Sequence, residues 1–309
     1  MSTYEELLQD AIDLHCHVDL EFSQTAFRKR EPEWHWLPKA EALGIRGVVL
    51  KSHWWPTAVA VPYIQQLYSG PVSLWSSITL NPIAGGPELW AVEAAAAMGA
   101  RVVWLPTWSA RQDLEGGGFH QRVAEAFGTL RPEALAGHAF LDQDGHLTLR
   151  GRELLDYCHR HALTLASGHV SWKETLAFSA EARSIGFERL IFTHPLAAAV
   201  QAPLEAAKRA AELGAWIELC WTNIAPGRMA PADAVAWIRQ VGLEHVVVST
   251  DYFRQANPSP PELFRLLLGT LYDAGLSADE IRTVASVNPA LALGLDRFPP
   301  VRSPQSVAT

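Results

Sequence analysis

Eight short apolar runs alternate with segments of helical pattern along the chain, and this alternation limits the folds open to it. The helical stretches, such as 88–100 and 172–186, end in Gly or in Gly followed by an apolar residue, a normal helix stop before a buried strand. Eight strand–helix units predict a single (β/α)8 TIM barrel of the α/β class. The alternative is an open doubly wound sheet, but the Gly-rich phosphate fingerprint that would favour it does not follow the first run. The runs cover 11–17, 47–53, 72–80, 101–107, 163–169, 189–195, 215–221 and 245–251.

The longest connection, 108–149, follows the fourth predicted strand. Loops of that length without structure are rare in compact domains, so we interpret it as an insertion over the barrel mouth. It contains Gly116-Gly117-Gly118, which could be a hinge or have no function, and a predicted small hairpin with an Asp-Gly turn at 144–145. Since no linker divides the sequence, we expect one barrel domain over 1–298 and a disordered tail over 299–309.

Side chains that bind metals or move protons gather at the predicted carboxyl ends of the strands. His15 and His17 end the first strand, and residues two apart in a strand point the same way, so both face one side. Inward positions at the carboxyl ends converge on the barrel mouth, where barrel active sites lie, so the pattern predicts a metal site. A lone histidine at a strand end is more often structural, but ligand types at five of eight ends are hard to ascribe to chance. The others are Lys51 and His53 after the second strand, His169 after the fifth, His194 after the sixth and Asp251 after the eighth.

Imidazole nitrogens with a carboxylate suit a divalent metal of borderline softness. We expect Zn²⁺ first, with Mn²⁺, Fe²⁺ and Co²⁺ as alternatives. Such an ion would lower the pKa of a bound water from about 16 towards about 7 and polarise an electrophile. Asp251 could both bind the ion and accept a proton from that water. The sequence therefore predicts a metal-activated water, with Asp251, Lys51 and His53 as catalytic residues.

The strand-end motifs together resemble the amidohydrolase superfamily of metal-dependent hydrolases, and more narrowly an uncharacterised amidohydrolase-related family. The superfamily layout is His-x-His on strand one, His on strands five and six, and Asp on strand eight, and the resemblance covers nearly the whole chain. It implies that His15, His17 and Asp251 hold one ion, while His169 and His194 hold a second ion or orient the substrate. The narrower likeness lies in LKSH (50–53), TLNPIAGG (79–86), LPT (105–107), SGHVSWKE (167–174), FTHP (192–195), STD (249–251) and SVNPALALGL (286–295).

The chain departs from that layout at strand four. Many binuclear members bridge two ions with a carboxylated lysine there, but this strand ends in Leu105-Pro106-Thr107. Lys51 on strand two could be carboxylated and bridge, could stay an ammonium that holds a substrate anion, or could extend into solvent. Glu218 on strand seven is a second bridging candidate. We therefore expect one or two ions.

Tryptophan is unusually frequent, with 12 residues against 6 tyrosines, and several indoles fall on predicted loops at the carboxyl ends. They suggest a large apolar or flat ligand, although we expect at least half of them to pack against the barrel. Arg254, on the loop after the eighth strand, could pair with a carboxylate or a phosphate. The substrate-binding candidates are Trp54, Trp55, Trp108, Trp172 and Arg254.

Charge and composition restrict the partners. A net charge of −8 without a Lys/Arg block argues against nucleic acid or an anionic membrane surface. The three cysteines form no C-x-x-C pair and the N-terminus lacks an apolar signal segment, so we expect a cytoplasmic protein. No run reaches the roughly 18 to 20 apolar residues of a membrane span. We expect a small-molecule substrate, and formation of a homo-oligomer stays open.

The leading hypothesis is a metal-dependent hydrolase that acts on a small, partly aromatic amide, lactone or ester. A metal-dependent lyase such as a decarboxylase on the same barrel, and a non-catalytic ligand-binding barrel, are the alternatives. A trinuclear phosphoesterase of the polymerase-and-histidinol-phosphatase kind also begins with His-x-His, but it needs further His and Glu ligands that find no place in this sequence.

Overall fold

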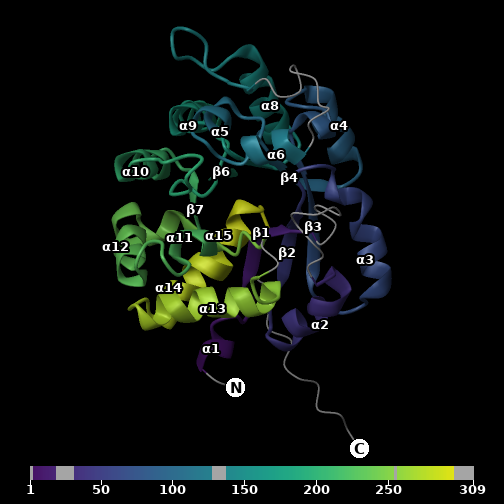
Figure 1. Cartoon of the computed structure of the whole chain (residues 1–309), viewed down its shortest axis with the longest axis vertical. Helices are drawn as coiled ribbons and strands as arrows, with labels where there is room; N and C mark the ends of the chain where they lie inside the picture. The colour runs from purple at the N-terminus through teal and green to yellow at the C-terminus, as the bar shows by residue number, and fades with distance from the viewer. Residues whose placement is uncertain (1–2, 19–30, 127–136, 254–255, 296–309) are drawn as a thin grey trace, which may run out of the picture.

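A computed structural model of the chain shows eight parallel strands in the order β1 to β8, which confirms the predicted (β/α)8 barrel. The structure describes residues 3–18, 31–126, 137–253 and 256–295. Its helices surround the strands on the outside (Figure 1). The strands are β1 (Ile12–His17), β2 (Gly47–Lys51), β3 (Ser73–Thr79), β4 (Ala100–Trp104), β5 (Thr164–Ala166), β6 (Leu190–Phe192), β7 (Trp216–Cys220) and β8 (Val246–Ser249).

Helices connect the strands and continue beyond the last of them. After β1 comes α2 (Glu33–Ala42), after β2 come η2 (Thr57–Val59) and α3 (Val61–Leu67), and after β3 come η3 (Pro82–Ala84) and α4 (Leu89–Ala97). The later connections use α8 (Leu149–Arg160), α9 (Trp172–Ile185), α10 (Leu204–Glu212), α11 (Trp221–Ile224), α12 (Pro231–Val241) and η4 (Leu243–His245). After β8 follow α13 (Pro260–Asp273), α14 (Ala278–Arg282), the π-helical η5 (Thr283–Val287) and α15 (Asn288–Ala292), and α1 (Thr3–Glu6) precedes β1.

The barrel closes between β8 and β1. The backbone N–H of His17 donates to the carbonyl of Tyr252 at 3.1 Å, and Cys16 pairs with Tyr252 in a parallel bridge. Apolar side chains from several strands fill the interior, and a larger apolar cluster packs between the strands and the helices. The interior cluster consists of Ile12, Leu14, Val49, Val102, Trp104, Ala166, Ile191 and Val247 with Ala290, Ala292 and Leu293.

A β-bulge in β1 directs the first histidine into the barrel. Asp13 pairs with Val48 and Cys16 with Leu50, so β1 carries one extra residue between these two pairs. Leu14 lies in the interior cluster, and by strict alternation His15 would then face the helices. Because of the bulge, His15 faces inward as well, and the Asp13 carboxylate accepts the His15 backbone N–H at 3.1 Å.

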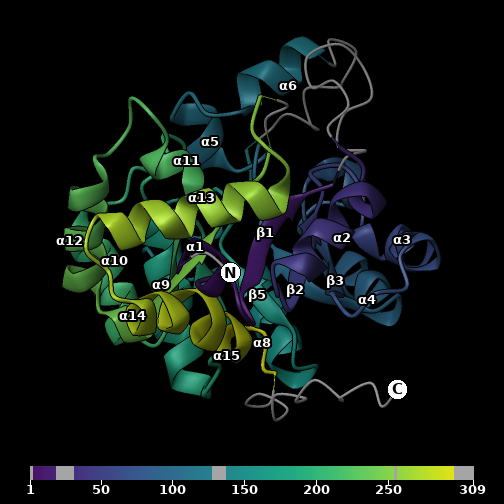
Figure 2. The same cartoon turned by 90° about the horizontal axis from the view of Figure 1, so that it is seen from below.

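The predicted insertion after β4 is confirmed in its described part. It contains α5 (Arg111–Glu115) and α6 (His120–Ala126), and 127–136 lies outside the described residues. Leu141 and Leu147 pair in an antiparallel bridge around Gly145, whose φ of 81° fits the predicted Asp-Gly turn. Figure 2 shows α6 and α15 on opposite sides of the barrel. The insertion therefore lies away from the end that α15 covers.

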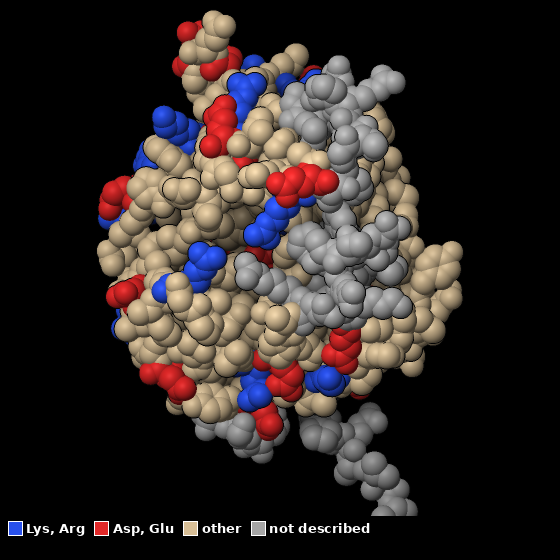
Figure 3. Space-filling model, viewed as in Figure 1, with Lys and Arg blue, Asp and Glu red and all other residues tan. Residues whose placement is uncertain are grey.

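The surface and the chain ends add three observations. Acidic and basic side chains of the described residues are interspersed over the face in Figure 3. Among the described helices, none combines the length and the apolar character that crossing a bilayer requires. The predicted tail, 299–309, lies outside the described residues, so its disorder stays a prediction.

Candidate metal centre

A cavity of about 180 Å³ opens at the carboxyl ends of the strands, and all the predicted catalytic and metal-binding residues except His15 line it. It collects side chains from β1, β2 and the connections after β4 to β8, which are far apart in sequence. His15 lies deeper, with no exposed surface. The lining residues are His17, Lys51, His53, Phe119, His169, His194, Ala197, Ala199, Thr222, Asp251 and Phe253.

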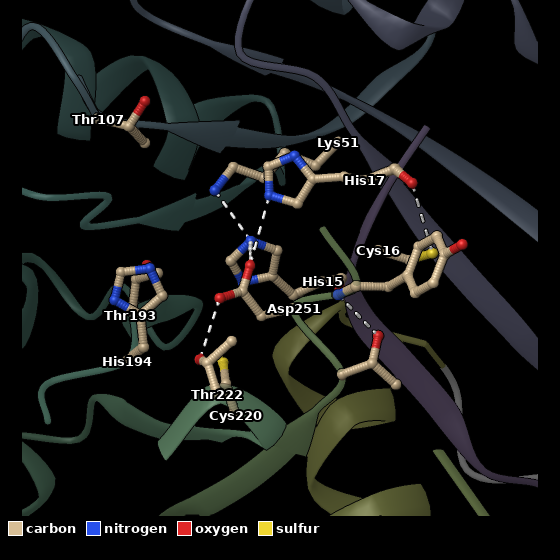
Figure 4. Close-up of polar contacts among 12 residues, drawn as sticks. His15, Cys16, His17, Lys51, Thr107, Thr193, His194, Cys220, Thr222 and Asp251 are labelled. Atoms are coloured by element: carbon tan, nitrogen blue, oxygen red, sulfur yellow. Dashed lines mark hydrogen bonds and ion pairs between the residues drawn. The ribbon is translucent and has the colours of Figure 1, made fainter. Parts of the chain in front are cut away.

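His15, His17 and Asp251 bring three donor atoms together at one wall of this cavity (Figure 4). Asp251 Oδ1 lies 3.2 Å from His15 Nε2 and 3.4 Å from His17 Nε2, and the three donor atoms lie within 4.8 Å of one another. Zinc at about 2.1 Å from tetrahedral ligands needs donor atoms about 3.4 Å apart. The donor chemistry and the spacing both fit a divalent ion.

The backbone is strained at two of the predicted ligands. Asp251 has φ 44° and His194 has φ 25°, which residues other than glycine rarely adopt. Such conformations cost about 1–3 kcal/mol and occur mostly where a site demands them. In each case the turn follows the end of a strand, β8 or β6, and aims a polar side chain at the cavity.

The Asp251 carboxylate stays ionised in this setting. Burial alone would raise its pKa, but the neighbouring imidazoles of His15, His17 and His194 outweigh burial and hold the pKa far below the ordinary value. Its second oxygen, Oδ2, accepts a hydrogen bond from the Thr222 hydroxyl at 3.2 Å. Asp251 therefore presents one oxygen to the histidines and the other towards Thr222.

Glu218 orients His15 through the ring nitrogen Nδ1. Both Glu218 carboxylate oxygens lie 3.3 Å from His15 Nδ1, and Oε2 also accepts the backbone N–H of His194 at 3.2 Å. Burial raises the Glu218 pKa, but the charge of His15 and the hydrogen bond from it lower the pKa overall. An ionised carboxylate only accepts, so it places the His15 proton on Nδ1 and leaves Nε2 for a metal.

Cys220 belongs to a second, deeper group of donor atoms with His15 and Glu218. Burial first, and then the charges of Glu218 and Asp251, raise the pKa of the Cys220 thiol well above its usual range. A protonated thiol is a poor metal ligand. The group around Asp251 is therefore the better candidate for an ion.

Lys51 contacts the same histidine nitrogen as Asp251. Its Nζ lies 2.9 Å from His15 Nε2 and 4.4 Å from the centre of the Trp104 ring, and the residue is only 1% exposed. The ring face attracts a cation, which favours the ammonium form. The sequence placed Lys51 at the mouth correctly, but the contact with Trp104, an interior residue of β4, had no sequence signal.

His53 is held by residues from two of the strand-end motifs, Thr107 of LPT and Asn81 of TLNPIAGG. Its Nδ1 lies 3.0 Å from Thr107 Oγ1, and the Asn81 side-chain amide donates to that same oxygen at 2.8 Å. Its ring centre lies 4.6 Å from that of His17. Burial first, and then the charges of His17 and Lys51, lower the His53 pKa well below the ordinary value, so His53 is neutral.

His169 and His194 also line the cavity, with ring centres 5.0 Å apart. His169 Nδ1 lies 2.5 Å from Asp113 Oδ2, a contact across 56 positions that sequence reasoning missed. His194 Nδ1 is buried without a hydrogen-bond partner among the described residues. Burial first, and then the neighbouring His169, lower the His194 pKa to about 3, so the His194 ring is neutral.

The tryptophans do not line this cavity. Trp108 has no exposed surface and Trp54 is 6% exposed, and their rings pack together with centres 5.6 Å apart. Trp55 lines a separate apolar groove between α2 and α3, and Trp172 packs half-buried on the core at the start of α9. None of these four indoles lines this cavity, and their predicted role in substrate binding stays a prediction.

Two phenylalanines, and none of these tryptophans, supply aromatic surface to the cavity. Phe119 and Phe253 meet edge to face with ring centres 5.5 Å apart, and both lie within 6 Å of the His53 ring. Phe253 follows Asp251 by two residues, which is the one sequence signal that pointed to it. Arg254 lies outside the described residues, so its predicted role stays a prediction.

Several solved structures have a fold similar to that of this chain. They include an amidohydrolase from Pseudomonas aeruginosa (TM-score 0.64, 12% identity, 94% of this chain and 97% of that chain) and the probable dipeptidase PvdM from the same organism (TM-score 0.61, 12% identity, 94% and 96%). A probable 2-pyrone-4,6-dicarboxylic acid hydrolase from Acinetobacter baumannii matches with TM-score 0.57 and 12% identity over 93% of this chain and 100% of that chain. At 12% identity these matches show that the chain shares its fold with these proteins, which agrees with the fold that the resemblance implied.

The sequence of the chain shows directly which family it belongs to. Residues 10–218 match the model of a family described as being of unknown function (DUF6282), which covers most of the barrel including β1 to β6. No curated protein matches the chain. The family assignment leaves the activity to be argued from the site.

Proposed function

We propose that this protein is a metal-dependent hydrolase that uses a metal-activated water on a small amide, lactone or ester. The convergence of His15 Nε2, His17 Nε2 and Asp251 Oδ1 at the wall of the barrel-mouth cavity carries the proposal. In a TIM barrel this is the end at which catalytic groups gather. The similar fold of the solved amidohydrolases supports the reaction class.

His15, His17 and Asp251 would hold one ion. His169 and His194 would hold a second ion or orient the substrate. When bound, a divalent ion, Zn²⁺ first and otherwise Mn²⁺, Fe²⁺ or Co²⁺, lowers the pKa of water and polarises the substrate carbonyl. Glu218 keeps His15 in the tautomer that leaves Nε2 unprotonated.

Asp251 is the proton acceptor of the proposed reaction. Its Oδ1 faces the two histidines, while Oδ2 accepts from Thr222 and lies at the cavity. Oδ2 therefore takes the proton from the attacking water and later passes it to the leaving group. The low pKa of this carboxylate ensures that it is unprotonated when the water arrives.

Lys51 serves as a cation that holds the acid group or the developing negative charge of the substrate. A metal on His15 Nε2 would displace the Lys51 amine from that nitrogen, and the ammonium would then be available to contact the substrate. The packing of Nζ over Trp104 supports an ammonium over a carboxylated amine. Neutral His53, aligned by Thr107, completes this side of the cavity as a hydrogen-bonding group.

The cavity favours a small substrate with an apolar or aromatic part. Its volume of about 180 Å³ lies below the roughly 300–1,000 Å³ of pockets for drug-sized ligands. Phe119 and Phe253 offer ring surfaces beside the polar groups. The three cysteines are buried and none forms a disulfide, which suits a reducing compartment and supports a cytoplasmic location.

The test loads the metal-free protein with Zn²⁺ or Mn²⁺ and assays a panel of small esters, lactones and amides in ¹⁸O-labelled water. We expect turnover with one ¹⁸O atom in the product acid, and Asp251→Asn should abolish it. Asp144→Asn, in an exposed Asp-Asp-His group away from the cavity, is the matched control and should keep full activity. Release of carbon dioxide without ¹⁸O would identify a lyase, and tight ligand binding without turnover would identify a binding barrel; either result overturns the proposal.

A further inference from the structure

Asp113, in the inserted helix α5, is a buried acid with no role in the scheme above. It has no exposed surface, and its Oδ2 lies 2.5 Å from His169 Nδ1. Its other oxygen, Oδ1, accepts the backbone N–H of His120 at 2.6 Å. Both carboxylate oxygens therefore have a hydrogen-bond partner, Oδ1 within the insertion and Oδ2 at His169.

The triple glycine shapes the loop that encloses this carboxylate. A Cβ on Gly118 would lie 2.4 Å from Asp113 Oδ2, closer than real Cβ atoms come, so only glycine lets the backbone pass there. Gly117 has φ 68°, which glycine adopts without strain, and the Gly118 N–H donates to the Asp113 carbonyl at 2.9 Å. The glycines therefore fit a tight wrap around Asp113 better than the hinge that the sequence suggested.

The arrangement fixes which nitrogen of His169 carries the proton. The oxygen of Asp113 that faces His169 can only accept a hydrogen bond, so the proton sits on Nδ1 and the Nε2 lone pair is left for a ligand. A carboxylate that orients a metal-binding histidine in this way also makes it a better ligand. The contact is a charge-assisted hydrogen bond to an ionised acceptor, which is short and strong.

We propose that Asp113 is a positioning residue, which holds His169 in the tautomer and orientation needed to bind the second ion or the substrate. The insertion after β4 thereby becomes part of the active site, because it supplies Asp113 to His169 and Phe119 to the cavity wall. This inference rests on the proposed function for its metal, but the tautomer of His169 can be measured without any metal.

Asp113→Asn tests the proposal because it should reverse the tautomer. The His120 N–H holds the amide oxygen at the Oδ1 position, so the amide NH₂ takes the place of Oδ2 and donates to His169 Nδ1. The His169 proton then moves to Nε2, where it blocks ligation. ¹⁵N NMR of the metal-free protein reports this directly, with the His169 signals assigned by comparison with His169→Ala.

Zinc affinity, measured by competition with a chromogenic chelator, is the second readout. Asp113→Asn should weaken the binding of the ion that His169 contacts by about 10- to 100-fold. If His169 only orients the substrate, the turnover number should fall by the same factor instead. The matched control is Glu115→Gln on the exposed side of α5, which should change neither readout. Gly118→Ala keeps Asp113 but pushes its carboxylate away, and it should reproduce the loss.

A double-mutant cycle separates positioning from general stability. In a His169→Ala background, Asp113→Asn should have no further effect on zinc affinity or turnover, because its partner is already gone. A further full loss in that background, or an Nε2–H tautomer of His169 in the wild-type protein, would overturn the proposal. If the wild-type protein binds no zinc at all, the proposed function fails, while the NMR result still decides the role of Asp113.

Discussion

Gly168 offers the sharpest test of how the barrel mouth is built, because it lies next to His169 where two connections touch. Its φ is 59°, and a Cβ there would lie 2.3 Å from the Leu105 carbonyl oxygen and 2.7 Å from that of Pro106. Both obstacles are backbone atoms and cannot rotate away. The His169 N–H also donates to the Pro106 carbonyl at 3.0 Å, so any shift of this contact moves His169.

Two costs add up in Gly168→Ala. A left-handed backbone at a residue with a Cβ costs about 1–2 kcal/mol. Forcing a methyl group into a filled site costs about 1–3 kcal/mol more. Gly186, the residue after α9, has φ 72° with nothing within 4 Å of its Cβ position, so Gly186→Ala carries the first cost alone. We therefore expect Gly168→Ala to lose about 2–5 kcal/mol of unfolding free energy and Gly186→Ala about 1–2 kcal/mol.

Urea unfolding of both variants and of the wild type, in buffer with a chelator, measures these losses without a contribution from metal binding. The slope of free energy against urea should stay equal among the three proteins, so that midpoints can be compared. Zinc affinity should also fall in Gly168→Ala and stay unchanged in Gly186→Ala. Equal losses in the two variants would refute the close approach between the connections after β4 and β5.

Three further predictions concern the site and its surroundings. Glu218→Gln should weaken zinc binding by about 10- to 100-fold in chelator competition, because the His194 N–H holds the amide oxygen and turns the amide NH₂ towards His15 Nδ1; unchanged affinity would argue against this role. Trp108→Ala should cost about 3–5 kcal/mol in urea unfolding yet leave the KM of any substrate found unchanged, and a large rise in KM would restore Trp108 as a substrate contact. Removing zinc should lower the melting temperature of the wild type, since free zinc at 100 times its Kd adds about 2.7 kcal/mol, and a His15→Ala, His17→Ala double variant should show no such shift.

The sequence predicted the barrel because its strands and helices repeat with clear periods and regular stops. It also predicted which residues meet at the mouth, since the carboxyl ends of parallel strands must converge. The position of His15 depends on the bulge after Asp13, which strict alternation does not contain. The two histidines still share a face, since they are two residues apart and the register is regular from Cys16 on.

The remainder of the site depends on contacts that no local pattern encodes. Asp113 lies in a segment without strand periodicity and reaches His169 only through the tertiary fold. Tryptophan on a loop at the mouth looks the same in sequence whether it faces the cavity or packs behind it. Trp108 packs against Trp54 and Val123, so burial of apolar surface decided its place instead of ligand binding.

The metal site itself can be located in crystals of the protein loaded with zinc, measured on either side of the zinc absorption edge. We expect an anomalous difference peak at about 2.0–2.2 Å from His15 Nε2, His17 Nε2 and an Asp251 oxygen. An empty map at these three atoms, with zinc only at exposed positions such as Asp142 and His146, would contradict this expectation.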